Sequence, residues 1–528
     1  MYQSPTIEYA DLWPLLVVLG AACVGIVVEA LVPRGRRFAT QTGLTLAGLG
    51  VALVGTVVVG VRLPAGEAAR GVIASEGALA IDGPSLVLWG MTLVLALGGA
   101  LLFAERRLEG GVSVFSGQAA ALPGTPAERE ASTRGLEHTE VFPLLLFAVG
   151  GMMLFPAAND LLMLFVALEV MSLPLYLLCG LARRRRLLSQ EAALKYFMLG
   201  AFSSGFFVYG LALVYGYAGS MELAAVADTI RDGDGNDTLL LLGLGLMAVG
   251  LLFKVGAVPF HAWTPDVYQG APTAVTAFMA AGTKVAAFGA LLRLLYVALG
   301  TDLAWQPMLW VIAIVTMLVG SGLAVVQTDV KRMLAYSAVA HTGFLLTGVL
   351  GLESGGADAG AGPFTSTEAV LFYLAAYSLA TIGAFALVTV VRDSGGEATG
   401  FASWTGLGRR APLAAGAFGF LLLSMAGIPL TAGFVGKWAV FAVALSAGAW
   451  PVVLVAIASS IVAVFFYVRF VYLMFFAPDA AGAQPAAVTT PSALTSVVVV
   501  LSVVGTLVLG IVPGPLLDLL ADAGSFLR

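Results

Sequence analysis

The sequence predicts an all-α integral membrane protein with about 14 transmembrane helices. Of its 528 residues, 59% are hydrophobic and only 11% are charged, whereas a soluble domain would carry roughly 25% charged residues. The apolar residues lie in runs long enough for the roughly 20 residues that a helix needs to cross a bilayer. These runs are apolar all round, without the alternation of a membrane strand, which excludes a β-barrel. The net charge of −5, with the basic residues in short clusters, argues against a nucleic-acid partner.

Fourteen stretches have the length and apolar character of a membrane helix. The first three lie near 12–32, 42–62 and 84–104. The next five lie near 141–157, 160–181, 191–217, 239–258 and 272–299. Five more lie near 306–327, 333–352, 367–391, 411–448 and 450–476, and the last lies near 492–513. We expect four parts: 1–140 with helices 1–3 and a cytoplasmic loop, 141–300 with helices 4–8, 301–477 with helices 9–13, and 478–528 with helix 14.

Clusters of Lys and Arg indicate the orientation, because short cytoplasmic loops keep an excess of basic residues. Each cluster follows an odd-numbered helix: Arg34, Arg36 and Arg37; Arg106 and Arg107; Arg183 to Arg186; Lys331 and Arg332; and Arg392, Arg409 and Arg410. The opposite loops are acidic or neutral, with Asp228, Asp232, Asp234 and Asp237 after helix 6 and Glu353 and Asp358 after helix 10. We therefore expect the odd helix ends in the cytoplasm and both termini outside. No Lys or Arg precedes the first span, so we expect this helix to be retained rather than cleaved as a signal peptide.

The chemistry is expected to lie within the membrane and to need no cofactor in this chain. The loops 105–140 and 218–238 are too short for a folded catalytic domain. The two cysteines, Cys23 and Cys179, form no C-x-x-C pair and leave an iron–sulfur cluster or a zinc site without ligands. Three histidines also argue against a haem. Any redox chemistry must therefore take place in another chain.

Ionisable residues inside the predicted helices are the main candidates for function. Lys254, Lys284 and Lys437 lie within helices 7, 8 and 12, Lys195 lies one turn into helix 6, and Glu169 lies midway along helix 5. Each charge costs at least about 2.5 to 3.5 kcal/mol to insert, which is tolerated where charges pair, face water or titrate. Lysine suits proton transfer because burial and a nearby carboxylate change its proton affinity in opposite directions. A row of lysines with one carboxylate therefore predicts a proton pathway.

Structural roles are the alternatives for several charged residues. Lys195 follows Glu191 by four residues, a spacing that also predicts a surface ion pair. Arg293 and Arg469 lie near helix ends, and we interpret both as interfacial anchors. His261 would either relay protons or hydrogen-bond free carbonyls, and His341 would either do the same or serve polar packing.

Two of the charged helices are also interrupted. Helix 7 breaks at FKVGAVPFHAWTP, with Pro259 and Pro265, and helix 12 breaks at MAGIPLTAGFVGK, with Pro429. Breaks at matching places in two halves of a membrane protein indicate inverted repeats around a transport path, although ordinary kinks are the alternative. Lys254 precedes one break and Lys437 follows the other, which is the reversed order that inverted copies would show.

Five segments resemble the antiporter-like membrane subunits of proton-pumping NADH:quinone oxidoreductase, respiratory complex I. They are LEVMSLPLYLLCGLARR, EAALKYFMLGAFSSGFFVYG, FKVGAVPFHAWTPDVYQGAPTAVTAFMAAGTKVAAF, DVKRMLAYSAVAHTGF and AGIPLTAGFVGKWAVF. The resemblance spans about 141–476 and is greatest to the type called subunit N. The type called M usually has a glutamate where Lys437 stands, and the type called L continues into a long lateral helix for which this chain is too short.

The resemblance implies a role for each candidate residue. Glu169 and Lys254 would form a coupled ion pair, Lys284 would be the central relay lysine, and Lys437 the terminal lysine on the exit side. Lys195 matches a further family lysine, and His261 matches the family's histidine after the broken helix.

The resemblance also implies partners and a location. The partners would be other complex I subunits, especially the neighbouring membrane subunits K and M, together with membrane lipids. FMN, iron–sulfur clusters, NADH and a menaquinone or ubiquinone would be bound by partner subunits, and the location would be the bacterial plasma membrane. The alternative is a subunit of a multisubunit cation (Na⁺)/proton antiporter, which shares the broken helices and lysines.

Overall fold

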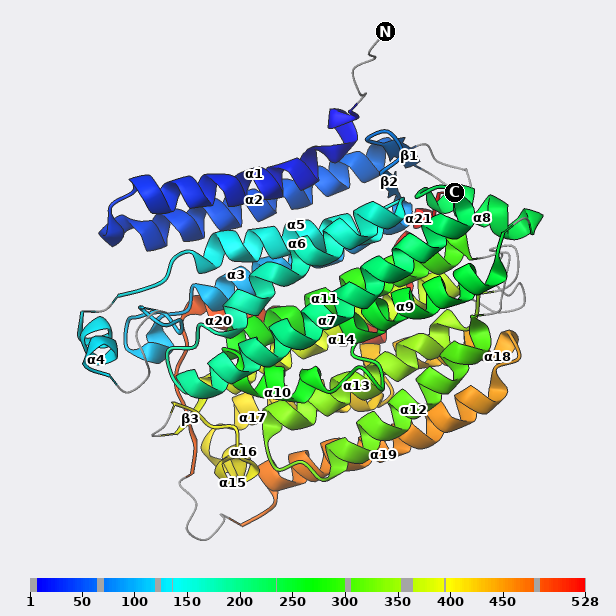
Figure 1. Ribbon diagram of the computed structural model, residues 1–528. Coiled ribbons are helices and arrows are strands. Elements are labelled where there is room, and N and C mark those ends of the chain that lie inside the picture. The colour runs from blue at the N-terminus through cyan, green and yellow to red at the C-terminus, as the bar shows by residue number, and fades with distance from the viewer. Residues whose placement is uncertain are drawn as a thin grey trace.

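The computed structural model describes residues 7–63, 71–118, 125–134, 136–233, 235–299, 305–352, 364–393, 396–478 and 485–527. Within these ranges the chain forms one bundle of helices that lie side by side, with short strands only at its two ends (Figure 1). Asp234, Glu353 and Asp358 of the predicted acidic loops lie outside the described residues.

Every predicted span corresponds to a helix or to a pair of helices. The first three are α1 (Tyr9–Leu31), α2 (Arg34–Arg62) and α3 (Gly83–Phe103). The next five are α5 (Val141–Ala157), α6 (Leu161–Cys179), α7 (Arg186–Ala218), α9 (Asp237–Val255) with the short α10 (Trp263–Gly270), and α11 (Thr273–Arg293). The remaining six are α12 (Gln306–Val325), α13 (Val330–Val349), α14 (Ser366–Val390), α17 (Pro412–Ala426) with α18 (Ala432–Ser446), α19 (Trp450–Phe475) and α20 (Ala493–Ile511).

Short elements cover the two ends of the bundle. They are η1 (Arg107–Glu109), α4 (Pro126–Thr133), α8 (Leu223–Asp232), the π-helical η2 (Leu294–Ala298), α15 (Phe401–Trp404), α16 (Leu407–Arg410) and α21 (Gly514–Ala523). The strands are β1 (Gly71–Ala74), β2 (Leu79–Asp82), β3 (Val391–Asp393), β4 (Gly396–Glu397) and β5 (Ala487–Val488).

The long helices are those of a membrane protein with a buried centre. Eleven of the described helices are long and apolar enough to cross a membrane, and α5, α17 and α18 are shorter apolar helices. The most apolar window of α11 is wholly buried and that of α14 is 89% buried, while the window of α20 is only 22% buried. Leucine, valine and phenylalanine side chains remain exposed on the outer helices, where the acyl chains of a bilayer would solvate them. The two central helices α11 and α14 pack against each other, so a charge on α11 is shielded from lipid.

The basic clusters meet at one end of the bundle, which we call the basic end (residues 105–118, 181–186, 391–393 and 396–410). Glu109 pairs with Arg184 at 2.8 Å and with Arg392, and Arg183 donates to the Ser113 carbonyl at 2.8 Å. Much of the loop 105–140 is therefore part of this end, where it joins clusters that follow different odd-numbered helices. In Figure 1 the basic end carries α4, β3 and α15.

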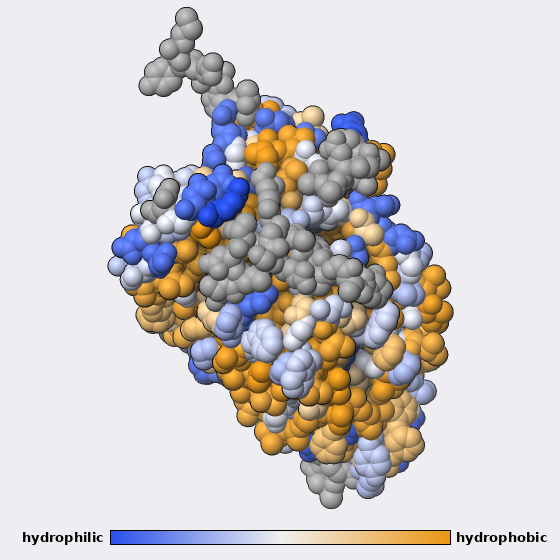
Figure 2. Space-filling view, turned by 90° about the vertical axis from the view of Figure 1, so that its right-hand side faces the viewer, coloured by the Kyte–Doolittle hydropathy of each residue, from blue (hydrophilic) through white to orange (hydrophobic). Residues whose placement is uncertain are grey.

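Both ends of the described chain lie at the other end of the bundle. The Glu8 carboxylate accepts a hydrogen bond from the Ser75 amide at 2.8 Å, and the Leu527 amide donates to Asp82 at 2.9 Å. Figure 2 looks onto this end and shows orange apolar residues along the flanks, with blue polar residues gathered mainly in its upper half. The two ends of the chain thus share one side, as the helix count predicts.

The helices from α5 to α11 and from α12 to α19 form two copies of one arrangement. In the first copy α5 packs on α6 and α11, α6 packs on α7, and α7 packs on α9. In the second copy α12 packs on α13 and α19, α13 packs on α14, and α14 packs on α17 and α18. The same order of neighbours in both copies supports the predicted repeat.

The first turns of α6 and α13 show that the copies are inverted. Asp160 caps α6 and Asp329 caps α13, and each carboxylate accepts a backbone N–H three residues later. The next amides donate to Met221 O at 2.9 Å and to Thr399 O at 2.7 Å, in the segments that follow α7 and α14 respectively. The α13 start lies at the basic end, whereas the α6 start lies beside the β1–β2 turn at the other end, where the Asn159 amide donates to Gly77 O.

Both predicted breaks are present. The helix α9 ends before Gly256 and α17 ends before Gly427, and these glycines have φ values of 75° and 87°, which favour a residue without Cβ. Pro259 and Pro429 lie in the non-helical segments between the half-helices, whereas Pro265 lies in the first turn of α10. The last carbonyls of α9 and α17 are thereby left without partners in their own helix.

Candidate functional site

Lys284 lies at the centre of the bundle, against the free end of α9. Its side chain is 4% exposed. The ammonium donates to Ala338 O at 2.7 Å and to Thr342 Oγ1 at 2.5 Å on α13, and it approaches Val255 O, the last carbonyl of α9, at 3.4 Å. The Tyr377 ring of α14 lies 5.4 Å from Nζ. Since the C-terminal end of a helix carries partial negative charge, the broken helix helps to hold this cation.

Lys254 is the residue before Val255, whose carbonyl Lys284 approaches. The surroundings of Lys254 are aromatic. Its side chain is 3% exposed, and Nζ contacts the Tyr176 hydroxyl at 3.4 Å. The rings of Tyr176, Tyr196 and Phe253 lie 5.2, 5.3 and 5.5 Å from Nζ. No carboxylate lies within 4 Å of this ammonium in the part of the chain that the structure describes. Lys254 therefore has fewer hydrogen-bond partners than Lys284.

Glu169 faces α7 rather than Lys254 directly. The Ser204 hydroxyl of α7 donates to its Oε1. The carboxylate is near enough to Lys254 for a Coulomb interaction, but no salt bridge joins the two charges among the described ion pairs. The coupled pair that the family resemblance implies is thus an interaction at a distance in this structure, with hydroxyl groups on each partner.

Lys437 closes the row at the second break. It is 5% exposed, and Nζ donates to Ala426 O at 2.9 Å and to Ser460 Oγ at 2.9 Å. Ala426 is the last residue of α17, so the carbonyl that the break leaves free is bound by a lysine, as Lys284 approaches the last carbonyl of α9. The Phe344 ring lies 4.9 Å from Nζ.

His341 lies between Lys284 and Lys437, and the sequence alone left its role open. On α13 it lies between the two Lys284 contacts, Ala338 and Thr342, and it is 2% exposed. Its Nδ1 hydrogen-bonds to Tyr373 at 2.6 Å, and its Nε2 to Tyr467 at 3.2 Å, which in turn contacts Ser337. Sequence reasoning missed these two hydroxyls, because they come from α14 and α19 and no spacing along α13 indicates them.

Lys195 and His261 lie apart from the buried row. Lys195 is 41% exposed and pairs with Glu191 and with Asp266 of α10, both at 2.7 Å. The surface ion pair that its spacing predicts is therefore present. Asp266 also pairs with Arg332 at 2.8 Å. His261 lies in the break after α9, and its Nδ1 is buried without a hydrogen-bond partner among the described residues.

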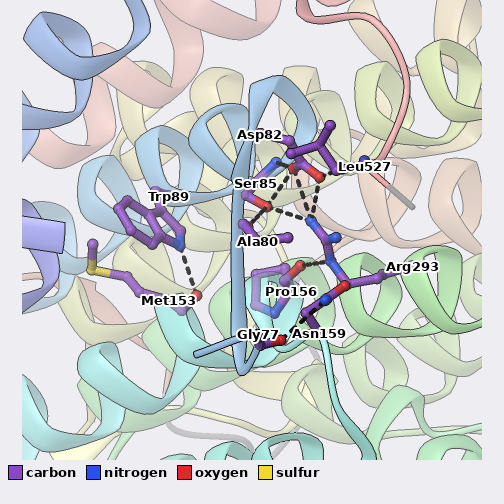
Figure 3. Close-up of polar contacts among 10 residues, drawn as sticks. All are labelled: Gly77, Ala80, Asp82, Ser85, Trp89, Met153, Pro156, Asn159, Arg293 and Leu527. Atoms are coloured by element: carbon purple, nitrogen blue, oxygen red, sulfur yellow. Dashed lines mark hydrogen bonds and ion pairs between the residues drawn. The ribbon is translucent and has the colours of Figure 1, made fainter. Parts of the chain in front are cut away.

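The interpretation of Arg293 as an interfacial anchor is wrong. Its side chain and that of Asp82 are both fully buried, and Nη2 contacts the two carboxylate oxygens at 2.8 Å each. Nη2 also contacts Ser85 Oγ at 2.6 Å, and Nε donates to Pro156 O at 2.6 Å (Figure 3). The error arose because the position near a helix end suggests lipid headgroups, whereas the start of α3 and the end of the chain cover it. Arg469, by contrast, is exposed and donates to Val325 O at 2.8 Å.

The donor set does not include an arrangement for a metal ion. Among the described residues, no group of three or more His, Cys, Asp or Glu side chains could hold one. Cys23 is exposed and Cys179 is buried, and neither is in a disulfide. The arrangement instead offers buried cations joined by hydroxyls, carbonyls and one imidazole, which are groups that exchange protons or order water.

Comparisons with known proteins agree with this geometry. The family described as NADH:quinone oxidoreductase/Mrp antiporter, transmembrane, matches residues 158–506. A protein of Nocardioides sp. strain JS614 named NADH-quinone oxidoreductase subunit N is 70% identical in an alignment of length 532 that covers 100% of both chains. A protein of the same name from Rhodococcus opacus is 53% identical and covers 99% of this chain and 97% of its own.

Solved structures extend the comparison to the fold. A chain of respiratory complex I from Thermus thermophilus has 33% identity and a TM-score of 0.74, with 97% of this chain and 100% of that chain covered. A chain of the Mrp complex from Dietzia sp. has a TM-score of 0.76 over 98% of this chain and 97% of that chain, but at 23% identity it shows the fold alone. The chain belongs to the NADH:quinone oxidoreductase/Mrp antiporter membrane family, among the subunit N sequences of bacterial NADH-quinone oxidoreductases.

Proposed function

We propose that the chain is the proton-translocating membrane subunit of an NADH:quinone oxidoreductase and moves protons from the cytoplasm to the outside. The observation that carries this proposal is the continuous row of buried groups from Lys254 through Lys284 and His341 to Lys437. Quinone reduction in neighbouring subunits would supply the energy. Relatives with 50–70% identity over almost their whole length bear the name of such a subunit.

The first transfer would run from Lys254 to Lys284 across the end of α9. Lys254 lies in the last turn of α9, and Lys284 contacts the carbonyl of the next residue, Val255. Lys254 has one hydroxyl at 3.4 Å, whereas Lys284 has two close acceptors. A proton released by Lys254 would therefore find better acceptors around Lys284, with water completing the path.

The second transfer would run from Lys284 to Lys437 by way of α13. Thr342 contacts Lys284 at 2.5 Å, and the neighbouring His341 holds two tyrosine hydroxyls. Imidazole can accept a proton on one nitrogen while releasing one from the other. Lys437 would then discharge toward the end of the bundle where both chain ends lie.

The free-energy change that accompanies movement of Glu169 relative to Lys254 is large enough to drive one cycle. Export of one charge against 100 mV costs about 2.3 kcal/mol. Two unit charges brought to 4 Å gain about 4 kcal/mol at an effective dielectric constant of 20. Formation and loss of this contact, starting from the separated state seen here, would change the stability of the Lys254 cation by enough to release or recover a proton.

Lys195 and His261 would couple this row to the broken helix. Lys195 binds α10 through Asp266, and His261 lies in the segment that joins α9 to α10. We assign the chain boundaries 1–140, 141–300, 301–477 and 478–528 to the N-terminal helices, the two repeats and the C-terminal helix. The basic end would face the cytoplasm of a bacterial plasma membrane, with both termini outside and with membrane subunits K and M as neighbours. FMN, iron–sulfur clusters, NADH and quinone would be bound in partner subunits.

The test is Lys284→Ala in the purified complex, reconstituted into liposomes. We expect the complex to assemble and to lose most NADH-driven acidification, because the central acceptor is gone. Arg231→Ala is the matched control, since Arg231 is exposed on α8 and its ion pair among the described residues is a local one with Asp228. Full pumping stoichiometry in a well-assembled Lys284→Ala complex would remove Lys284 from the relay.

The cation/proton antiporter remains the second candidate because the Mrp complex shares the fold. The two functions differ in the cofactors of the subunits that would co-purify with the chain. Gentle purification from the native membrane should bring flavin and iron with a complex I subunit, and neither with an antiporter. Sodium-for-proton exchange by a preparation without redox centres would decide for the antiporter.

A further inference from the structure

A small polar cavity at the basic end reaches the first turns of α11 and α13. Its volume is about 50 Å³, which exceeds the roughly 10–15 Å³ that a cavity needs to hold a water. It lies where the two repeats meet the loop 105–118. Its charged and hydroxyl lining residues are Glu109, Arg184, Arg185, Thr273, Lys331 and Glu397.

A hydrogen-bonded chain lines this cavity. Lys331 is 2% exposed, and its ammonium donates to Ala271 O at 2.9 Å and to Thr273 Oγ1 at 3.0 Å. The Thr273 hydroxyl donates in turn to Glu397 Oε2. Because the ammonium can only donate, it turns the threonine hydrogen toward the carboxylate. The hydrogen-bonded chain therefore runs from the ammonium through the hydroxyl to the carboxylate.

Thr273 is also the first residue of the helix that carries Lys284. The two positions are 11 residues apart, about three turns or roughly 16 Å along an α-helix, and hence on one face. Thr276 lies on the same side of α11 and contacts Tyr268 O at 3.3 Å. The facing helix α14 adds Tyr377, whose ring lies 5.4 Å from Lys284, and Thr381 one turn further toward the basic end. Hydroxyl groups thus lie on both α11 and α14 between the basic end and the central lysine.

We propose that this cavity is the proton inlet of the subunit, with Glu397 as the group that takes protons from water and Thr273 as the group that passes them inward. Lys331 is a positioning residue, because it fixes the direction of the Thr273 hydroxyl. In the transfer, Glu397 takes a proton from hydronium, and the Thr273 hydroxyl hydrogen turns away from the neutral carboxyl group. The threonine oxygen then accepts the proton from Glu397 while its own hydrogen passes to the water column, which delivers one proton to neutral Lys284. The inference rests on the proposed proton translocation.

Of the two carboxylates that line the cavity, Glu109 and not Glu397 has the contacts of a purely structural residue. Glu109 contacts two arginines, Arg184 and Arg392, and ties the loop to the basic end. Glu397 contacts a threonine hydroxyl with its side chain, and it meets Arg185 only through its backbone carbonyl, at 3.0 Å. The charged groups around Glu397 are Glu109, Arg184, Arg185, Asp329, Lys331 and Arg392.

The experiment compares Glu397→Gln, Thr273→Val and Thr273→Ser in the reconstituted complex. We expect the first two to slow NADH-driven acidification about tenfold or more, within the range for loss of a positioned proton-transfer group. The difference in rate between Glu397→Gln and the unmodified complex should grow as the pH on the uptake side rises, because the variant lacks the carboxylate that collects the scarcer protons. Thr273→Ser should retain most of the rate. Glu130→Gln is the control, since Glu130 is an exposed acid of the same end, on α4.

Each outcome separates the inlet from the relay. If Glu397→Gln and Thr273→Val pump like Glu130→Gln while Lys284→Ala does not pump, the inlet is wrong and the proposed function stands. If Lys284→Ala pumps normally as well, the proposed function itself fails. Should Thr273→Val not assemble, Glu397→Gln alone decides: acidification at the rate of Glu130→Gln overturns the inlet.

Discussion

The buried pair between Arg293 and Asp82 gives the sharpest prediction for stability. Arg293→Met removes a charge from a place where both side chains are 0% exposed. It deletes two contacts of 2.8 Å to the carboxylate and contacts of 2.6 Å to Ser85 Oγ and Pro156 O. It also removes the cation from the Phe526 ring, 4.8 Å away.

The expected cost is about 3 to 5 kcal/mol, because removal of one partner leaves a buried charge that water cannot reach. The Asp82 carboxylate would keep hydrogen bonds from Ser85 N at 3.0 Å, from Ser85 Oγ at 2.6 Å and from Leu527 N at 2.9 Å. These bonds should hold the cost nearer the lower limit. Asp82→Asn should be similar, and the double variant should be less destabilised than the sum by about 1 to 3 kcal/mol.

The assay is the temperature at which half of the fluorescently tagged chain is lost from its size-exclusion peak in mild detergent. Arg469→Met is the control, since Arg469 makes one exposed bond and should change stability by no more than about 0.5 kcal/mol. Equal midpoints for Arg293→Met and Arg469→Met would refute the argument that burial makes this pair indispensable. Strict additivity in the double variant would show that the two charges do not act on each other.

Three further predictions concern the proton row. Thr342→Val should slow NADH-driven acidification by about tenfold, because a hydrogen bond to a charged group is worth about 1.5 to 3 kcal/mol. Thr342→Ser keeps the hydroxyl and should retain the acidification rate. Ser460→Ala removes one of two bonds to Lys437 and should reduce pumping while assembly, measured by native electrophoresis, is unchanged; an unaltered rate would argue against Lys437 as the exit group. Glu169→Gln should lower the number of protons moved per NADH without loss of subunit content, and a normal ratio would show that this carboxylate does not drive Lys254.

Sequence reasoning predicted the spans, their breaks and the depth of Lys254, Lys284 and Lys437 because hydropathy and proline act locally. It could not give the partners of these lysines, since Ala338, Thr342 and Ser460 come from other helices, 54, 58 and 23 residues away in the chain. It also misjudged Arg293, because Asp82 lies 211 residues earlier and nothing in the spacing joins them. Long-range pairs of this kind depend on packing, which the periodicity of one helix does not encode.

The two breaks explain why lysine, and not another cation, lies at these positions. Each break frees carbonyls at the end of a half-helix, and a compact ammonium with three donors can bind such a carbonyl together with a neighbouring hydroxyl. Lys284 does this with Val255 O and Thr342, and Lys437 with Ala426 O and Ser460. A planar guanidinium holds its proton permanently, so arginine would keep the contacts and lose the exchange. Arg293, which only holds the fold together, is accordingly the one buried cation of α11 that lies away from a break.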